Sequence, residues 1–341
     1  MLKECDHLPA GLLDAEPAAL KTILGGPTLI HLPGRRGEPL FVSILLHGNE
    51  TVGLYAIQNL LRKYRERELP RALSLFVGNV EAASVGLRRL AGQPDYNRVW
   101  PGSIEADSPE RRMMSRILDI MRERAPFASI DLHNNTGINP HYACINAVDN
   151  RFMQLAALFS RTVVYFIRPL GVQSKAFASL CPAVTVECGK TGQTAGVEHA
   201  GEFIEACLHL SELADKPPPA HELELYHTVA IVKVAGAYSF SFTDAAADIG
   251  FVGDLDHLNF RELPQGTRIG RLNNGLDHLP LEAWDEGGSD VADRYFAVED
   301  DWIQTRRALM PSMLTLDERV IRQDCLGYLM ERYPLDKARS E

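Results

Sequence analysis

A histidine and a glutamate closely follow one apolar run: Ile44-Leu45-Leu46 is succeeded by His47 and, three residues later, by Glu50. The last side chain of a core strand points into the crevice at the edge of its sheet, and the first turn of a following helix places another beside it. His47 and Glu50 could therefore supply two of the three protein ligands of a catalytic zinc ion, whose fourth position is left for water. The structural alternative is that Asn49 is a helix N-cap and Glu50 a first-turn acid that suits the helix dipole.

A third ligand is offered by His133, which ends the short apolar run at 127–133. Because it also ends a core strand, we expect it at the same sheet edge as His47. Asp131, two residues earlier, is placed to orient a ligand through a hydrogen bond. A single histidine at a strand end is commonly a loop residue. Two at the ends of two core strands, together with Glu50, favour a metal site.

Glu187 provides a carboxylate at the end of another apolar run, Val184-Thr185-Val186. A buried carboxylate is costly unless it has a partner or a chemical role. It is the candidate base for the attacking water in metal-assisted hydrolysis, and the alternative is a structural glutamate in a salt bridge. Gly189-Lys190-Thr191 looks like the end of a phosphate-binding loop, but Val184 stands where that motif needs its first glycine, which excludes a Walker motif.

The segment 88–102 is rich in side chains that bind carboxylates. Arg88 and Arg89 lie ahead of Asp95, and Asn97 and Arg98 follow it directly. Beside a metal ion, arginines of this kind clamp a substrate carboxylate with two hydrogen bonds or polarise a carbonyl group. Taken alone, the segment is also compatible with a surface loop that carries ordinary charges.

Four motifs in this order resemble those of the succinylglutamate desuccinylase/aspartoacylase family of zinc carboxypeptidase-like hydrolases, over roughly residues 40–215. The motifs are His47-Gly48-Asn49-Glu50, Asp95-x-Asn97-Arg98, Asp131-Leu132-His133-Asn134 and Val186-Glu187-x-Gly189. Each is weak by itself, but four in order at predicted strand ends are strong together. The region beyond residue 220 resembles the smaller β-rich domain of the family more loosely.

The resemblance implies a metal centre and a base. His47, Glu50 and His133 are expected to bind one zinc ion per chain. Glu187 is expected to be the general base, which takes a proton from water and passes it to the leaving amine.

The resemblance also implies a set of substrate contacts. Asn97 and Arg98 are expected to bind the substrate carboxylate. An arginine ahead of them is expected to polarise the scissile carbonyl; Arg88 and Arg89 both qualify, and we prefer Arg89, with Arg88 among the substrate-binding residues. Aspartoacylases carry a further substrate-binding arginine before the base, where this chain has none. Lys175 is the substitute there, as a point charge rather than a planar fork, and this departure argues against N-acetylaspartate as the substrate.

The predicted activity is zinc-dependent hydrolysis of a linear, non-peptide amide bond in an N-acyl amino acid or a similar small carboxylate-bearing amide. A zinc metallocarboxypeptidase that acts on peptide C-termini would use the same ligands and an arginine for the terminal carboxylate. A non-catalytic zinc-binding regulatory protein is a third interpretation, which the presence of Glu187 disfavours. No GxSxG elbow is present, so a serine nucleophile is not indicated.

Strands and helices alternate through the first two thirds of the sequence. Apolar runs predict strands at 28–32, 40–47, 73–80, 127–133, 141–148, 162–167 and 183–188. Periodicity and capping residues predict helices at 51–68, from 108, from 150 and from about 195 to 214. The alternation predicts an α/β fold with a mixed, mostly parallel sheet and helices on both faces, which the resemblance identifies as zinc carboxypeptidase-like.

A linker at about 216–220 divides the sequence, because Lys216-Pro217-Pro218-Pro219 cannot continue a helix. We expect a zinc hydrolase catalytic domain over 1–215 and a smaller β-rich domain over 221–341. In the latter, 226–242 alternates as strands do, and helical pieces are predicted near 300–310 and 316–332.

Composition narrows the partners. The 341 residues carry a net charge of −10, which argues against nucleic acid or an anionic membrane as the main partner. The sequence has no apolar signal-peptide core near its start and no run near the ~20 apolar residues of a membrane span. Six scattered cysteines without a CxxC pair are typical of reduced thiols. We therefore expect a cytoplasmic protein with a small-molecule substrate, and a homo-oligomer is compatible with the sequence.

Overall fold

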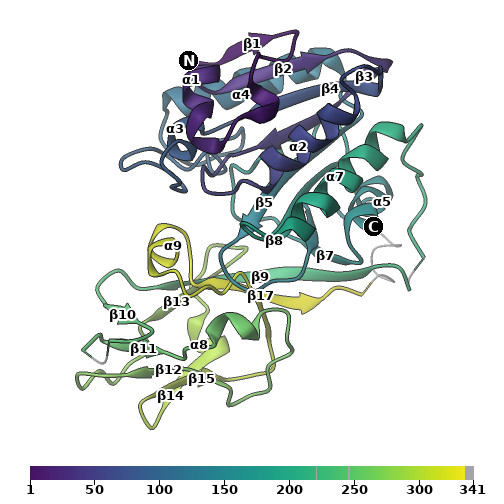
Figure 1. Ribbon diagram of the computed structural model, residues 1–341. Coiled ribbons are helices and arrows are strands. Elements are labelled where there is room, and N and C mark those ends of the chain that lie inside the picture. The colour runs from purple at the N-terminus through teal and green to yellow at the C-terminus, as the bar shows by residue number, and fades with distance from the viewer. Residues whose placement is uncertain (220, 245, 335–341) are drawn as a thin grey trace. The chain divides into compact units, whose positions relative to one another are not determined.

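The computed structural model describes residues 1–219, 221–244 and 246–334, which form two compact units (Figure 1). The described part of the first unit comprises residues 1–134, 141–219 and 221–225, and that of the second comprises 135–140, 226–244 and 246–334. Each unit is described by itself below. The assignment of 1–215 to a catalytic domain and of 221–341 to a smaller domain stays a prediction.

A mixed sheet forms the centre of the first unit, in the order β1-β2-β4-β3-β5-β8-β6-β7. Its strands are β1 (Lys3–Cys5), β2 (Thr28–Leu32), β3 (Gly34–Ile44), β4 (Leu69–Val77), β5 (Ala128–Asn135), β6 (Tyr142–Ile145), β7 (Thr162–Tyr165) and β8 (Ala183–Lys190). Strands β4, β3 and β5 are parallel, whereas β2 pairs antiparallel with β4 and β6 pairs antiparallel with β8. The predicted α/β fold with a mostly parallel sheet is confirmed.

Helices cover both faces of this sheet. They are α1 (Leu20–Leu24), α2 (Val52–Lys63), α3 (Val80–Ala83), α4 (Pro109–Arg124), α5 (Asn150–Phe159), α6 (Gln173–Phe177) and α7 (Thr194–His209). Helix α7 packs against α2 and α5 (Figure 1). A Cβ on Gly53 of α2 would lie 2.8 Å from Ile44, while Phe41 of the same strand stacks on Phe177 of α6. Since residues three apart in a strand face opposite ways, α2 and α6 lie on opposite faces.

An aromatic cluster packs on the α6 side of the sheet. The rings of Phe41 and Phe177 stack with centroids 4.2 Å apart, and Trp100 meets Phe177 edge-on at 5.8 Å and Phe76 at 6.2 Å. All four side chains are fully buried. Because Trp100 lies only two residues beyond the segment 95–98, this packing holds that segment against the sheet.

The second unit is rich in short strands. They are β9 (Glu224–Val234), β10 (Phe240–Ser241), β11 (Ile249–Phe251), β12 (Arg268–Leu272), β13 (Leu281–Asp285), β14 (Phe296–Glu299), β15 (Trp302–Thr305), β16 (Met310–Ser312) and β17 (Gly327–Arg332). Strands β13 and β17 pair with β9, and β16 pairs with β17, whereas β10-β11-β12-β15-β14 form a separate sheet. The helices here are α8 (Ala292–Tyr295) and α9 (Glu318–Gln323). In the described part of the chain, no helix is long and apolar enough to cross a lipid bilayer.

The β-rich character of the second region is confirmed, but its two predicted helical pieces are wrong in extent or type. The segment 300–310 contains β15, which pairs antiparallel with β12 and β14. The segment 316–332 is helical only over α9 and then forms β17. Short apolar runs do not distinguish strands from helices by periodicity, and pairing partners distant in the sequence decide the outcome.

The aromatic cluster yields a stability prediction. Replacement of Phe177 by alanine (Phe177→Ala) removes a fully buried ring and leaves a cavity, so we expect the free energy of unfolding to fall by about 3–5 kcal/mol. Urea unfolding followed by circular dichroism measures the loss. The control is Leu158→Ala in α5, where the side chain is 44% exposed and a change within about 0.5 kcal/mol is expected. Equal losses in both variants would contradict the role given to the cluster.

Candidate functional site

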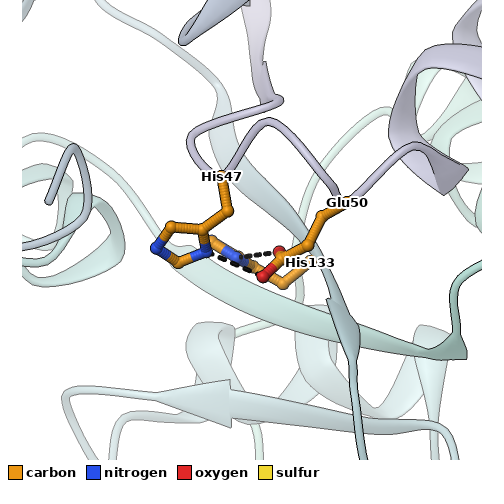
Figure 2. A group of neighbouring side chains, drawn as sticks. All are labelled: His47, Glu50 and His133. Carbon is orange, nitrogen blue, oxygen red and sulfur yellow. Dashed lines mark hydrogen bonds and ion pairs between the residues drawn. The ribbon is translucent and has the colours of Figure 1, made fainter. Parts of the chain in front are cut away.

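Two imidazoles of the first unit converge on the carboxylate of Glu50. Nδ1 of His47 lies 2.8 Å from Oε1 of Glu50, and Nδ1 of His133 lies 2.7 Å from Oε2. Figure 2 shows both imidazoles turned toward this carboxylate. All three side chains are buried. The structure thus brings together the three residues that the sequence analysis selects as metal ligands.

The two histidines follow or end two neighbouring parallel strands. His47 comes three residues after the end of β3, and His133 lies near the end of β5. The register pairs Ser43 of β3 with Asp131 of β5. The carboxyl ends of both strands therefore meet at one edge of the sheet, where ligand sites of open α/β sheets form.

The turn between His47 and Glu50 requires a glycine. A Cβ on Gly48 would lie 2.2 Å from the backbone nitrogen of Ala83 and 2.7 Å from the carbonyl oxygen of Leu87. The Gly48 N–H also donates to the carbonyl oxygen of Arg88 at 3.0 Å. The end of α3 and the segment that follows it are therefore packed directly on the turn that carries His47 and Glu50.

An aspartate lies behind each imidazole. Nε2 of His47 is 2.9 Å from Oδ1 of Asp95, and Nε2 of His133 is 2.8 Å from Oδ2 of Asp131. Ser43 Oγ donates to the other Asp131 oxygen at 2.7 Å. A carboxylate at Nε2 fixes the ring orientation and keeps a proton there, which leaves Nδ1 able to offer its lone pair to a metal ion.

Asn134 joins the Glu50 turn to β5. Its backbone N–H donates to Oε2 of Glu50 at 3.1 Å, and its Oδ1 accepts from the N–H of Val52, the first residue of α2, also at 3.1 Å. The N-cap residue of α2 is Thr51, whose side chain makes no capping hydrogen bond. The alternative in which Asn49 caps the helix is therefore wrong, and a side chain from the neighbouring strand satisfies the helix start instead.

Charges within the cluster support one another. Burial alone would raise the pKa of Glu50, but the two imidazoles lower it below its ordinary value. Burial alone would lower the pKa of His47 and of His133, but the carboxylates that face each ring raise both values. The pKa of His133 is raised well above its ordinary value. Each buried charge is therefore stabilised by its partners, and removal of one would leave another uncompensated.

Of the two adjacent arginines, Arg88 contacts the cluster. Its Nη2 donates to Oδ2 of Asp95 at 3.1 Å, and its Nη1 lies 3.5 Å from Oε1 of Glu50. Burial alone would raise the pKa of Asp95, but the facing imidazole and Arg88 hold it well below its ordinary value. Arg89 donates from Nη1 to the carbonyl oxygen of Gln93 at 2.8 Å.

Glu187 is buried in β8, where it pairs with Tyr142 of β6. Burial raises the pKa of its carboxyl group to about 7, and the ligand cluster also acts on it, His133 lowering and Glu50 raising the value. A carboxyl group with a pKa near neutrality both takes up and releases a proton at neutral pH.

Asn97 and Arg98 adjoin the cluster as well. Nδ2 of Asn97 lies 3.3 Å from Oδ2 of Asp131 and 3.1 Å from Nε2 of His133. Nη1 of Arg98 donates to the carbonyl oxygen of Asn97 at 2.9 Å. The charge of Arg98 also contributes to the lowered pKa of Asp95, after the imidazole and Arg88.

Lys175 makes a different kind of contact. Its Nζ donates to the carbonyl oxygen of Ile167 at 2.6 Å. This hydrogen bond braces the segment that leads into α6. Binding of a substrate by Lys175 stays a prediction.

Sequence reasoning did not single out Gln173 or Asn134, and it named Asp95 only as part of a motif. Gln173 is fully buried at the start of α6, and its backbone N–H donates to Oδ1 of Asn97 at 2.9 Å. A glutamine at the start of a short helix gives no signal in one sequence. Asn134 directly follows His133, and this adjacency to a candidate ligand is the only signal that the sequence offers for it.

The converging donor atoms fit a divalent metal ion. One ligand atom from each of His47, Glu50 and His133 lies within 4.8 Å of the other two. Two imidazole nitrogens and one carboxylate oxygen form the donor set of many hydrolytic zinc sites, which keep a position open. Loss of the Nδ1 protons would turn both nitrogens into ligands on the side that already faces the carboxylate.

Comparison with known proteins agrees with this geometry. Residues 37–213 match the family model described as the succinylglutamate desuccinylase/aspartoacylase catalytic domain. That range contains all residues of the cluster. No protein in the curated set matches the sequence.

Solved structures share the fold of this chain at low sequence identity. A succinylglutamate desuccinylase from Chromobacterium violaceum is 18% identical with a TM-score of 0.57, covering 88% of this chain and 86% of its own. A succinylglutamate desuccinylase/aspartoacylase from Rhodobacter sphaeroides is 14% identical with a TM-score of 0.60, covering 89% and 88%. Murine aminoacylase 3 is 15% identical with a TM-score of 0.57, covering 88% and 96%. At these identities the likeness concerns the fold alone.

Proposed function

Because the chain belongs to the succinylglutamate desuccinylase/aspartoacylase family, we propose that it is a zinc-dependent deacylase that hydrolyses the amide bond of an N-acyl amino acid or a similar small carboxylate-bearing amide. The observation that carries the proposal is the convergence of His47, Glu50 and His133 beside the buried Glu187. The predictions of a cytoplasmic location, and of no nucleic-acid or membrane partner, belong to the same proposal.

One zinc ion per chain would be held by Nδ1 of His47, a carboxylate oxygen of Glu50 and Nδ1 of His133. When bound there, zinc supplies Lewis acidity, which makes hydroxide available at neutral pH and polarises a carbonyl oxygen. Asp95 and Asp131 hold the two imidazoles by their Nε2 protons, so that both rings keep the orientation that the ligand role needs.

Glu187 acts as the general base and then as the general acid. Its carboxylate takes a proton from the attacking water and gives it to the nitrogen of the leaving amine. A pKa of about 7 suits both steps, because the group is neither too weak to take the proton nor too strong to release it.

We assign polarisation of the scissile carbonyl to Arg88, in contrast to the preference for Arg89 from the sequence. The support is that Arg88 lies 3.5 Å from Glu50 Oε1, whereas Arg89 donates to a backbone carbonyl. A preorganised donor aimed at the developing oxyanion is worth about 3–4 kcal/mol. Arg98 binds the substrate carboxylate and thereby orients the amide.

The first test is a substrate panel. Succinyl, acetyl and formyl derivatives of Glu, Asp, Arg and aromatic amino acids, together with peptides, are assayed with zinc-loaded and with chelator-treated protein. We expect hydrolysis of at least one N-acyl amino acid, its loss on chelation and its recovery on zinc addition. Turnover confined to peptide C-termini would support the carboxypeptidase alternative. Zinc binding without any turnover would support the non-catalytic one.

The second test concerns Glu187. The substitution Glu187→Gln keeps the shape of the side chain but removes its basicity, so we expect kcat to fall by about 10²–10⁴-fold. Zinc content, measured by atomic absorption, should equal that of the wild type because Glu187 is not a ligand in this proposal. Near-wild-type kcat in the variant contradicts the assignment of the base.

The third test uses the adjacent arginines as a matched pair. Arg88→Ala is expected to lower kcat by about 10²–10³-fold through loss of an oxyanion donor. Arg89→Ala is expected to change kcat by no more than a few-fold. Steady-state kinetics on the best substrate of the panel compares them, and a larger loss in Arg89→Ala would restore the sequence-based preference.

A further inference from the structure

Asn97 lies between the two carboxylates that orient the imidazoles. Its backbone N–H donates to Oδ1 of Asp95 at 2.8 Å. Its side-chain Nδ2 lies 3.3 Å from Oδ2 of Asp131 and 3.1 Å from Nε2 of His133. The side chain is buried, with 6% of the residue exposed. One residue therefore contacts the support of both histidine rings.

The orientation of the Asn97 amide is dictated by α6. The backbone N–H of Gln173 can only donate, and it lies 2.9 Å from the Asn97 side chain, so the amide must present Oδ1 to it. The opposite end, Nδ2, must then face Asp131. With Oδ1 given to α6 and Nδ2 given to the carboxylate, both ends of the amide already have protein partners.

Gln173 is itself anchored on β5. Its Nε2 donates to Oγ of Ser129 at 2.7 Å. Ser129, Asp131 and His133 alternate along the strand, so their side chains share one face. The hydrogen bonds therefore run along that face from Ser129 through Gln173 and Asn97 to Asp131 and His133.

We propose that Asn97 is a positioning residue for the His133 ligand, set in place by the backbone N–H of Gln173. The inference rests on the proposed function for its kinetic consequences. Nδ2 and the His133 ring both donate to Oδ2 of Asp131, which fixes where that oxygen can lie. Loss of the amide would let the carboxylate move and the imidazole tilt, which weakens the metal site before any substrate binds.

The experiment measures zinc affinity without substrate, by competition with a chromophoric chelator. Asn97→Ala is expected to bind Zn²⁺ about 10–100-fold more weakly than the wild type and to have a lower kcat. The matched variant is Arg98→Ala, one residue later, which should raise KM and keep wild-type zinc affinity. If Asn97→Ala binds zinc as the wild type does and only raises KM, the proposal is wrong and Asn97 contacts the substrate.

A second pair of variants separates the backbone N–H from the side chain of Gln173. Gln173→Pro removes the N–H, and proline is tolerated there because Gln173 is the first residue of α6 and Val172 is extended at φ −88 and ψ 152. Gln173→Ala keeps the N–H and loses the same contact to Ser129. We expect zinc affinity to be about tenfold lower in the proline variant than in the alanine variant. Equal affinities overturn the role of the N–H.

The Gln173 pair decides the question if Asn97→Ala fails to fold, which circular dichroism reveals. Because zinc affinity is measured without substrate, absence of turnover across the substrate panel removes the deacylase proposal but leaves this test intact. Whether or not a substrate is found, zinc binding that is weaker in Gln173→Pro than in Gln173→Ala supports the inference, and so does weaker zinc binding in a folded Asn97→Ala.

Discussion

The buried carboxylate of Glu50 is the constraint on which the site depends. A carboxylate taken out of water costs several kcal/mol unless close partners compensate for it. Here two imidazole nitrogens approach its two oxygens, and a backbone N–H from Asn134 adds a third contact. His47 and His133 are in turn buried and need counter-charges at their other nitrogens. Each imidazole therefore needs a second carboxylate at Nε2, which Asp95 supplies to His47 and Asp131 supplies to His133.

The sheet fixes the positions of these side chains relative to one another. Strands β3 and β5 are parallel neighbours, so their carboxyl ends lie at the same edge of the sheet. His47, just after β3, and His133, near the end of β5, are therefore close together without a long connecting loop. Close approach of Gly48 to the end of α3 and to the segment that follows it leaves the Glu50 turn little freedom. Precision at the cluster is thus obtained from backbone hydrogen bonds and close backbone approach rather than from long flexible side chains.

The sequence predicts those features of the site that depend on residues close together in the chain, and it does not predict those that depend on distant segments. A polar residue at the end of an apolar run reveals a ligand candidate, because strand ends meet at one edge. The choice between Arg88 and Arg89 is not local, since adjacent loop residues point different ways and the path of the loop is set by α3 and the Gly48 turn. The contact of Gln173 with Asn97 joins segments 76 residues apart and leaves no pattern in either. For the same reason the sequence over 300–310 predicts a helical piece where β15 forms, because the pairing partners β12 and β14 lie in other segments.

The packing core and the chemical site are parts of one structure. The loop that supplies Asp95 and Asn97 ends at Trp100, whose ring is fully buried and whose backbone N–H donates to the carbonyl oxygen of Gly171 at 3.0 Å. A Cβ on Gly171 would lie 2.2 Å from the carbonyl oxygen of Arg98, so the segment entering α6 runs directly against this loop. The buried aromatic cluster thereby fixes the backbone of the loop whose Asp95 side chain accepts the outer hydrogen bond of His47. Since close-packed interiors transmit small displacements, a change in the aromatic core would reach the candidate metal-binding atoms through the loop rather than through solvent.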